Sequence, residues 1–416
     1  MKTQGLNKKM IAAGAIGNVL EWYDFAVYGY FATSIGRVFF PKEDAIAQLL
    51  FAFGVFAIGY LMRPLGGMLI GHIGDRVGRK EALSVSVAAM AIPTFIVGIL
   101  PGYEAIGLAA PILLTLCRML QGLSVGGEYT TSIVFMVENA PANRRGLAGA
   151  LACCGATLGI LLGSATGAAL AAIMSPESLD SWGWRIPFLF GLVIGFIGLL
   201  LRRNLEVRTE AQGVQKHPLT EILQSHRPLL AKLAGLSVFT AVSFYLIFVY
   251  LVSWLQLVDK MGQEISLQIN TISMVALLPV TIAAGALSDR IGRKPLLIGT
   301  VATTIFLAYP LFHGMYHQSQ IVVQLCQLGF SLLVGICLGV SPAFMAETAP
   351  AHVRSTSLAL GYNLTVGIVG GLTPLTATWL VNRTHSGIAP VFMIIAAGLI
   401  SFVTLLLMRE TYKKSL

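Results

Sequence analysis

The sequence GHIGDRVGRK (residues 71–80) returns in slightly altered form as GALSDRIGRK (residues 285–294). A second pair of stretches is related in the same way: ENAPANRR (residues 138–145) corresponds to ETAPAHVR (residues 347–354). The copies of the first motif begin 214 residues apart, and those of the second begin 209 residues apart. Because two motifs recur at nearly the same offset, we infer a duplication whose halves have the same orientation.

The stretches between these motifs are strongly apolar. The 416-residue chain is 56% hydrophobic and only 11% charged, whereas about a quarter of the residues in an average soluble domain are charged. Its mean hydropathy is +0.77. Apolar segments of about 20 residues are long enough to cross a bilayer as helices, so we predict an all-α polytopic membrane protein. Its twelve expected transmembrane helices span residues 11–34, 49–70, 82–101, 106–136, 146–174, 184–201, 232–256, 266–288, 295–313, 319–345, 355–381 and 389–408.

Twelve segments and one duplication predict two six-helix halves related by a parallel pseudo-repeat. The N-terminal bundle is expected over residues 1–201 and the C-terminal bundle over residues 232–416. Residues 202–231 between them are rich in charge and contain Pro218 and Pro228, so we interpret them as a cytoplasmic linker.

The 28 Lys and Arg residues are distributed by side of the membrane. If the N-terminus is cytoplasmic, 21 of them lie in the termini and cytoplasmic loops, while Arg63 and Arg118 lie inside predicted helices. The opposite loops hold only the remaining five: Arg37, Lys42, Arg185, Lys260 and Arg383. By the positive-inside rule, this bias predicts that both termini are cytoplasmic. The net charge of +9 is therefore a topology signal, and no nucleic-acid partner is expected.

The sequence does not support metal or nucleotide chemistry. All five cysteines lie in predicted helices, and no His or Cys spacing typical of a metal site occurs. The metalloprotease motif HExxH and the nucleotide-binding motif GxxxxGK[ST] do not occur. We therefore expect no metal, no cofactor and no enzymatic activity.

The first repeated motif has the pattern G-x-x-x-D-R-x-G-R-K, which resembles the signature of the major facilitator superfamily. Further stretches resemble its metabolite:proton symporter family, and more narrowly the proline/betaine transporters. These are EWYDFAVYGY (residues 21–30), LMRPLGG (residues 61–67), RMLQGLSVGGEY (residues 118–129) and WGWRIPF (residues 182–188). The resemblance implies a multi-pass protein of the bacterial inner membrane, in which two halves rock around a central site. We expect it to act as a monomer.

Two acids lie in the first predicted helix. Glu21, Asp24 and Tyr28 follow the spacing i, i+3, i+7 and therefore share one helix face. Because a charged group in lipid is costly, this face is expected to line the interior of the bundle. We interpret Glu21 and Asp24 as proton-coupling groups, with Glu128 as a third, and Tyr28 as a substrate contact. The alternative is a structural role, in which an acid is paired permanently with an arginine.

Arg63 and Arg118 are the candidate partners for these acids or for a substrate. A guanidinium presents a planar fork that suits a carboxylate, so both arginines, and Gln121 one turn after Arg118, are candidate substrate contacts. Alternatively, the arginines only neutralise the buried acids. In the second half, Tyr245 and Tyr250 could hold an ammonium group by cation–π attraction, although aromatic residues in such helices often only pack.

The charged residues of the repeated loops are expected to act as gates. A charge pair that forms in only one conformation biases the equilibrium between two states. The alternative is an ordinary set of juxtamembrane charges. The candidate gating residues are Asp75, Arg76, Arg79, Glu138, Arg145, Asp289, Arg290, Arg293, Glu347 and Arg354.

These features predict a secondary active transporter that takes up a small carboxylate-bearing metabolite together with protons, through alternating access. A zwitterion of the proline/betaine type is the first choice for its substrate. A di- or tricarboxylate of the citrate or 2-oxoglutarate type is the alternative, because two buried arginines would suit it. A protein of a different class, a membrane sensor or receptor, would bind such a ligand without moving it.

Overall fold

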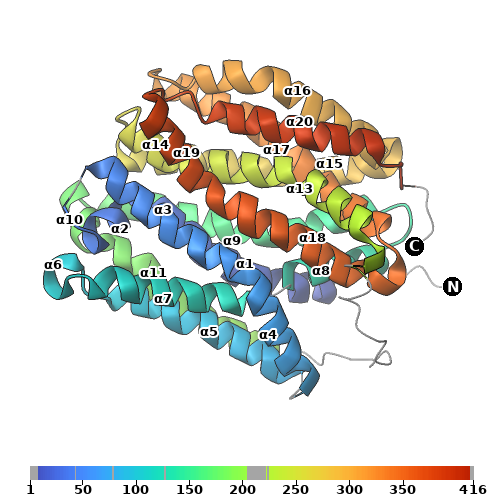
Figure 1. Ribbon diagram of the computed structural model, residues 1–416, viewed down its shortest axis with the longest axis horizontal. Helices are drawn as coiled ribbons and strands as arrows, with labels where there is room; N and C mark the ends of the chain where they lie inside the picture. Colours follow the sequence, from blue (N-terminus) through green and yellow to red (C-terminus); the bar gives the residue numbers. More distant parts are fainter. Residues whose placement is uncertain are drawn as a thin grey trace.

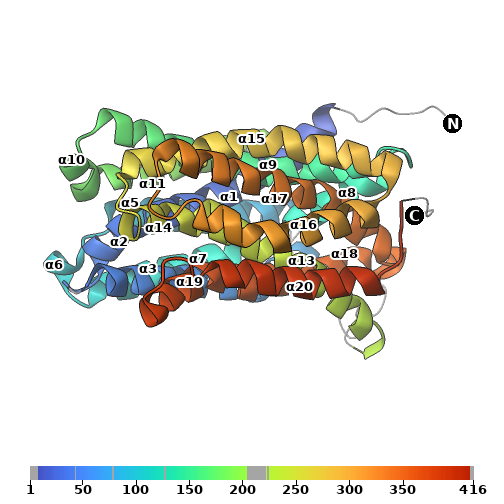
Figure 2. The same cartoon turned by 90° about the horizontal axis from the view of Figure 1, so that it is seen from above.

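The computed structural model is a bundle of long helices that run along one common axis (Figures 1 and 2). It describes residues 8–42, 44–76, 79–125, 128–203, 222 and 224–412. Within these residues, helices cover each of the twelve expected segments. The start of α1 and the end of the chain lie at the same end of the bundle, here called the terminal end (Figure 1).

Of the first six helical passages, three consist of two consecutive helices. The six passages comprise α1 (Lys8–Tyr30) with α2 (Ala32–Phe39), α3 (Ala45–Leu61) with α4 (Arg63–Arg76), α5 (Arg79–Ile99), α7 (Ala109–Ser124) with α8 (Glu128–Glu138), α9 (Arg145–Ile173) and α11 (Ile186–Arg203). Short helices at the end opposite the termini connect them: α6 (Tyr103–Ile106), α10 (Pro176–Ser181) and η1 (Gly183–Arg185).

The second six passages repeat this arrangement. They comprise α13 (Arg227–Tyr245) with η2 (Leu246–Tyr250) and α14 (Leu251–Leu257), α15 (Gln263–Ile291), α16 (Arg293–His313), α17 (Gln320–Thr348), α18 (Arg354–Leu364) with η4 (Thr365–Gly370) and α19 (Gly371–Thr384), and α20 (Val391–Leu407). The short helix η3 (Ala351–Val353) precedes α18. Helix α13 begins earlier than expected, because Pro228 lies in its first turn, where the missing N–H of a proline has no helical partner to lose.

The composition of these helices suits a membrane. By length and composition, eight helices within the described residues can cross a bilayer, and three shorter apolar helices accompany them. Many large apolar side chains face outward, among them Phe196, Phe306 and Leu407. In water such a surface would be costly, whereas in a bilayer it faces lipid.

The passage that carries Arg63 is interrupted at the residue before it, Met62. Helix α3 ends at Leu61 and α4 begins at Arg63, with Pro64 directly after it. The Pro64 nitrogen has no hydrogen to donate to the helical ladder, which permits a break at this point. The sequence therefore places a helix irregularity directly before a buried guanidinium.

Close approach of α3 and α7 brings Arg63 and Arg118 into the same region. A Cβ atom added to Gly122 would lie 2.0 Å from the carbonyl oxygen of Gly59 on α3. A contact of that length is impossible for any residue with a side chain. Glycine therefore allows the two helices to pack at this distance, as small residues commonly do between membrane helices.

Two π-helical turns in the second half pack against the same helices, α13 and α19. The turns η2 and η4 interrupt otherwise α-helical passages, and such turns are frequent at functional sites. Tyr245 ends the helix before η2, and the last residue of η4, Gly370, packs against its ring. The two irregular turns therefore position Tyr245.

The first and second six-helix sets meet along two main seams. Helix α9 packs along α15 and α17, and α3 packs along α19. At the terminal end of the first seam, a Cβ atom on Gly146 would lie 2.3 Å from the carbonyl oxygen of Gly285. The chain can therefore bring these two backbones together only because glycine occupies both positions.

Candidate functional site

Helix α1 carries both of its acids into the interior of the bundle. Glu21 is 7% exposed, Asp24 is 2% exposed, and Tyr28 on the same face is fully buried. The helical spacing thus places these side chains as the sequence predicted. Each acid is paired with a different arginine, which is how a buried charge in a membrane protein is tolerated.

Asp24 is held by groups from two other helices. Arg118 Nη1 lies 2.8 Å from Asp24 Oδ2, and Gln121 Nε2 donates to Asp24 Oδ1 over 2.9 Å. Thr94 Oγ1 on α5 lies 2.7 Å from the same oxygen. Arg118 Nη1 also donates to Gln121 Oε1 over 2.9 Å. Both carboxylate oxygens are therefore engaged, and the cluster binds α1, α5 and α7 together.

Glu21 pairs with Arg63. Arg63 Nη2 lies 2.7 Å from Glu21 Oε1, and the guanidinium carbon lies 5.2 Å from the ring centroids of both Trp22 and Tyr60. Arg63 Nε and Nη1 are buried without a hydrogen-bond partner among the described residues. Since a guanidinium has five N–H donors in a planar fork, Arg63 retains donors for a second carboxylate.

A cavity lies beside the Glu21–Arg63 pair. It is bounded by α1, α8 and α9 from the first six helices and by α13, α17, α18 and η4 from the second six. The volume within the cavity that the centre of a water molecule can reach is about 50 Å³. Its aromatic wall consists of Trp22, Tyr129, Phe244, Tyr245 and Tyr362. Because Trp22 also contacts the Arg63 guanidinium, the cavity and the ion pair share a side chain.

The expected substrate contacts divide into two groups in the structure. Tyr245 lines the cavity and donates a 2.8 Å hydrogen bond to Tyr60 Oη. Tyr28 instead donates to a backbone carbonyl of α3 over 2.9 Å, and Tyr250 packs against Phe53. Neither Tyr28 nor Tyr250 belongs to the described lining of the cavity, and the same is true of the Arg118–Gln121 pair. Arg63 is not a lining residue either, and it meets the cavity only through its contact with Trp22.

Several lining residues were not among the sequence-based candidates. Trp22, Tyr129 and Tyr362 form a continuous aromatic row, with ring centroids 5.8 Å and then 5.0 Å apart. Thr94, which contacts Asp24, was missed as well. An isolated threonine next to Pro93 in an apolar run is a usable signal for a buried polar contact, whereas aromatic residues in membrane helices give none.

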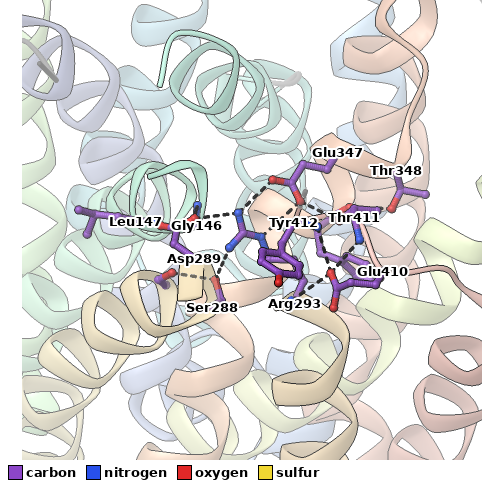
Figure 3. Close-up of polar contacts among 12 residues, drawn as sticks. Gly146, Leu147, Ser288, Asp289, Arg293, Glu347, Thr348, Glu410, Thr411 and Tyr412 are labelled. Atoms are coloured by element: carbon purple, nitrogen blue, oxygen red, sulfur yellow. Dashed lines mark hydrogen bonds and ion pairs between the residues drawn. The ribbon is translucent and has the colours of Figure 1, made fainter. Parts of the chain in front are cut away.

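A second polar network closes the terminal end between α9 and α15 (Figure 3). Asp289 accepts hydrogen bonds from the backbone N–H groups of Gly146 at 2.8 Å and Leu147 at 3.0 Å, in the first turn of α9. Arg293 Nη2 lies 2.8 Å from Asp289 and 3.0 Å from Glu347. We call these five residues the terminal latch. A carboxylate at a helix N-terminus accepts hydrogen bonds from free N–H groups and is attracted by the positive end of the helix dipole.

Glu410 and Thr411, which follow α20, also contact the latch. Glu410 accepts hydrogen bonds from the backbone N–H groups of Arg293 at 3.1 Å and Lys294 at 2.9 Å (Figure 3). Thr411 Oγ1 donates to Glu347 over 2.7 Å. These contacts fix the start of α16 and the orientation of Glu347, and no sequence motif pointed to them.

The remaining expected gating residues fall into three groups. Arg354 pairs with Glu138 across the seam between α18 and α8, which makes a second contact at the terminal end. Arg145 begins α9 and is buried, and Arg290 is exposed at the end of α15. The side chains of Asp75, Arg76 and Arg79 lie outside the described part of the chain, as does that of the proton-coupling candidate Glu128.

Asp289→Asn is expected to weaken the terminal latch. The amide keeps the shape of the side chain but loses the charge that binds Arg293 and the α9 N-terminus, a loss of about 1–2 kcal/mol. A shift of that size changes the ratio of closed to open states by about 5–30-fold. In a variant that retains Cys153 as its only cysteine, maleimide labelling of this cavity residue should accelerate by that factor.

Asp44→Asn is the matched control for this measurement. Asp44 also accepts a hydrogen bond from a helix N-terminus, but within its own helix α3 and at the opposite end of the bundle. Its substitution should leave Cys153 labelling unchanged. Equal labelling rates for the parent and Asp289→Asn would show that the latch does not control access to the cavity.

Comparison with known proteins places this architecture in a family. The sequence profile of the Major Facilitator Superfamily matches residues 15–374. The chain belongs to the major facilitator superfamily. The motifs of the repeated loops had predicted this membership, and the profile match confirms it. The all-α fold with two six-helix halves is confirmed as well. So is the prediction that the protein is a transporter and not an enzyme.

Relatives within the superfamily match nearly the whole chain. A glycine betaine/proline/ectoine/pipecolic acid transporter of Dickeya dadantii is 37% identical, over 99% of this chain and 85% of the relative. A proline/betaine transporter of Escherichia coli is 35% identical over the same shares. Among solved structures, the xylose transporter XylE from E. coli in a partially occluded inward-open conformation is 20% identical. It matches with a TM-score of 0.74 over 98% of this chain and 99% of that one, which is a likeness of fold.

Proposed function

We propose that this superfamily member takes up a small zwitterion of the proline/betaine type together with protons. The relatives at 35–37% identity are named for such substrates. The observation that carries the proposal is the buried Glu21–Arg63 pair: two guanidinium nitrogens of Arg63 have no hydrogen-bond partner among the described residues, and Arg63 contacts Trp22, which lines a cavity between the two halves. A group that can bind a proton and a group that can bind a carboxylate are thus connected to the cavity through Trp22, which follows Glu21 in sequence and contacts Arg63.

The pair suggests how proton and substrate are coupled. While Glu21 is ionised it neutralises Arg63, so a substrate carboxylate has little to gain from this guanidinium. Protonation of Glu21 leaves Arg63 without a counter-charge, which is costly at membrane depth, and a substrate carboxylate then supplies the missing charge. Proton and substrate therefore bind together, and neither is stable in the site alone.

We assign the Asp24 cluster a positioning role. Asp24 makes contacts to Arg118, Gln121 and Thr94, and its oxygens have no need of a further donor. The cluster fixes the rotation of α1 and thereby the direction of Glu21, three residues away. Glu128 stays a proton-coupling candidate, since its side chain lies outside the described residues.

The location of the chain follows from its charge distribution. The excess of Lys and Arg in alternate loops supports cytoplasmic termini in a bacterial inner membrane, with the terminal latch on the cytoplasmic side. Residues 1–201 and 232–416 would then be the two moving bundles, with residues 202–231 as the cytoplasmic linker, and the protein would act as a monomer. Alternating access would open the latch and the opposite end in turn.

Uptake into proteoliposomes tests the proposal. With labelled proline or glycine betaine outside, an inward proton gradient should produce accumulation, and a protonophore should abolish it. A pH difference of one unit supplies about 1.4 kcal/mol and supports up to about tenfold accumulation with one proton per substrate. Accumulation that follows a sodium gradient and ignores the protonophore would refute proton coupling.

A further inference from the structure

The cavity beside Arg63 has an unusual combination of walls. Five aromatic side chains line it, contributed by α1, α8, α13 and α18. Among the described lining residues, none is acidic or basic. An aromatic ring face attracts a cation, most strongly when water is excluded, so this cavity can hold positive charge without a carboxylate.

Two buried polar groups of the lining have no hydrogen-bond partner among the described residues. They are Trp22 Nε1, in a side chain that is 4% exposed, and Ser341 Oγ, in a residue that is 6% exposed. Unpaired buried donors cost free energy unless a ligand or water satisfies them. Both can donate to a carboxylate, and Trp22 lies against the positively charged Arg63 guanidinium.

The chemistry of the cation follows from the absence of an acid in this lining. A primary ammonium has three N–H donors that lose their water in such a cavity, and the described lining offers them only neutral hydroxyl groups and no carboxylate. A trimethylated ammonium has no N–H group, and its methyl groups suit the rings and the Met345 side chain. The walls therefore favour a methylated ammonium over an unmethylated one.

We propose that the cavity is a zwitterion subsite selective for methylated ammonium. The carboxylate of the ligand binds Trp22 Nε1 and Ser341 at the Arg63 side, and its methylated ammonium lies against the rings of Tyr129 and Tyr362. This inference rests on the proposed function and extends it, because it names the residues that choose between one zwitterion and another.

Three ligands separate the parts of this inference. Glycine betaine carries both charges, 3,3-dimethylbutanoate is its isostere with carbon in place of nitrogen, and glycine carries an unmethylated ammonium. Calorimetric titration of the purified chain should give a dissociation constant for glycine betaine at least about tenfold lower than for the other two. Tyr362→Leu should remove most of that advantage over the isostere, whereas Tyr362→Phe, which keeps a ring, should retain it.

The carboxylate end is tested separately. Trp22→Phe keeps a ring but removes the N–H donor, so it should weaken glycine betaine and 3,3-dimethylbutanoate by the same factor, about five- to tenfold. Phe239→Leu is the control, because Phe239 is a buried aromatic of α13 outside the described lining. It should leave all three dissociation constants unchanged.

The outcomes distinguish this inference from the function beneath it. If glycine betaine accumulates with the proton gradient but binds no better than its isostere, the cation subsite is wrong and the symport stands. The subsite is also wrong if Tyr362→Leu weakens both ligands equally. If the unaltered chain neither binds nor accumulates glycine betaine or proline, both proposals are wrong.

Discussion

Asp24→Asn is expected to destabilise the protein and to abolish transport in every mode. The substitution leaves Arg118, which has no exposed surface, without the carboxylate that pairs with it. Removing one partner of a buried ion pair typically costs about 3–5 kcal/mol, because the remaining charge is neither solvated nor paired. Thermal unfolding in detergent should show the loss, and both accumulation and counterflow should fall to background.

Two further variants show whether charge is the cause. The double variant Asp24→Asn/Arg118→Gln has no unpaired charge at this position. It should therefore recover most of the stability that Asp24→Asn loses, but it should not recover transport. Asp180→Asn breaks an ion pair with Arg37 whose side chains are 50% and 33% exposed, and it should cost at most about 1 kcal/mol. If Asp24→Asn unfolds at the temperature of the parent, Arg118 does not depend on this carboxylate.

The helices and the pairing of charges were predictable to different degrees. Continuous apolar segments and the repeated loops predicted the twelve passages, because both signals are local in sequence. Helical spacing also predicted that Glu21 and Asp24 share an inward face. It could not predict which arginine binds which acid, since that depends on the packing of α3 and α7, and the glycine contacts that set this packing have no signature in sequence.

The cavity illustrates what sequence patterns omit. Tyr245 and Tyr250 are on the same helical passage, but Tyr250 is the last residue of the π-helical turn η2, which starts directly after Tyr245. Of the two, only Tyr245 belongs to the described lining of the cavity. Trp22 is adjacent to Glu21 in sequence, yet its role depends on α8 and α18, which lie far along the chain. Contacts of Glu410 and Thr411 with the latch likewise arise only from tertiary structure.

Glu21→Gln is expected to separate substrate exchange from proton coupling. Its amide resembles the protonated acid: it is neutral, and it leaves the Arg63 guanidinium free for a substrate carboxylate. Counterflow, in which substrate exchanges without net proton movement, should therefore continue. Accumulation should disappear, so that a pH difference of one unit, which supports up to about tenfold accumulation in the parent, supports none in the variant.

The structure gives reasons to expect this contrast with Asp24→Asn. Arg63 lies against the rings of Trp22 and Tyr60 and beside the cavity, so a substrate carboxylate can replace the lost partner. Arg118 is enclosed by the Asp24 cluster and has no such replacement within reach. Substrate should consequently raise the unfolding temperature of Glu21→Gln more than that of the parent, whereas it should not rescue Asp24→Asn.

Glu21→Asp is the matched control, because it retains a group that can bind a proton. It should keep some accumulation, with an altered dependence on pH, whereas Glu21→Gln should show no accumulation at any pH. If Glu21→Gln accumulates substrate like the parent with an unchanged pH dependence, then the Glu21–Arg63 pair is structural. The proton would then have to travel by another acid, and Glu128, which follows the break between α7 and α8, would be the first to test.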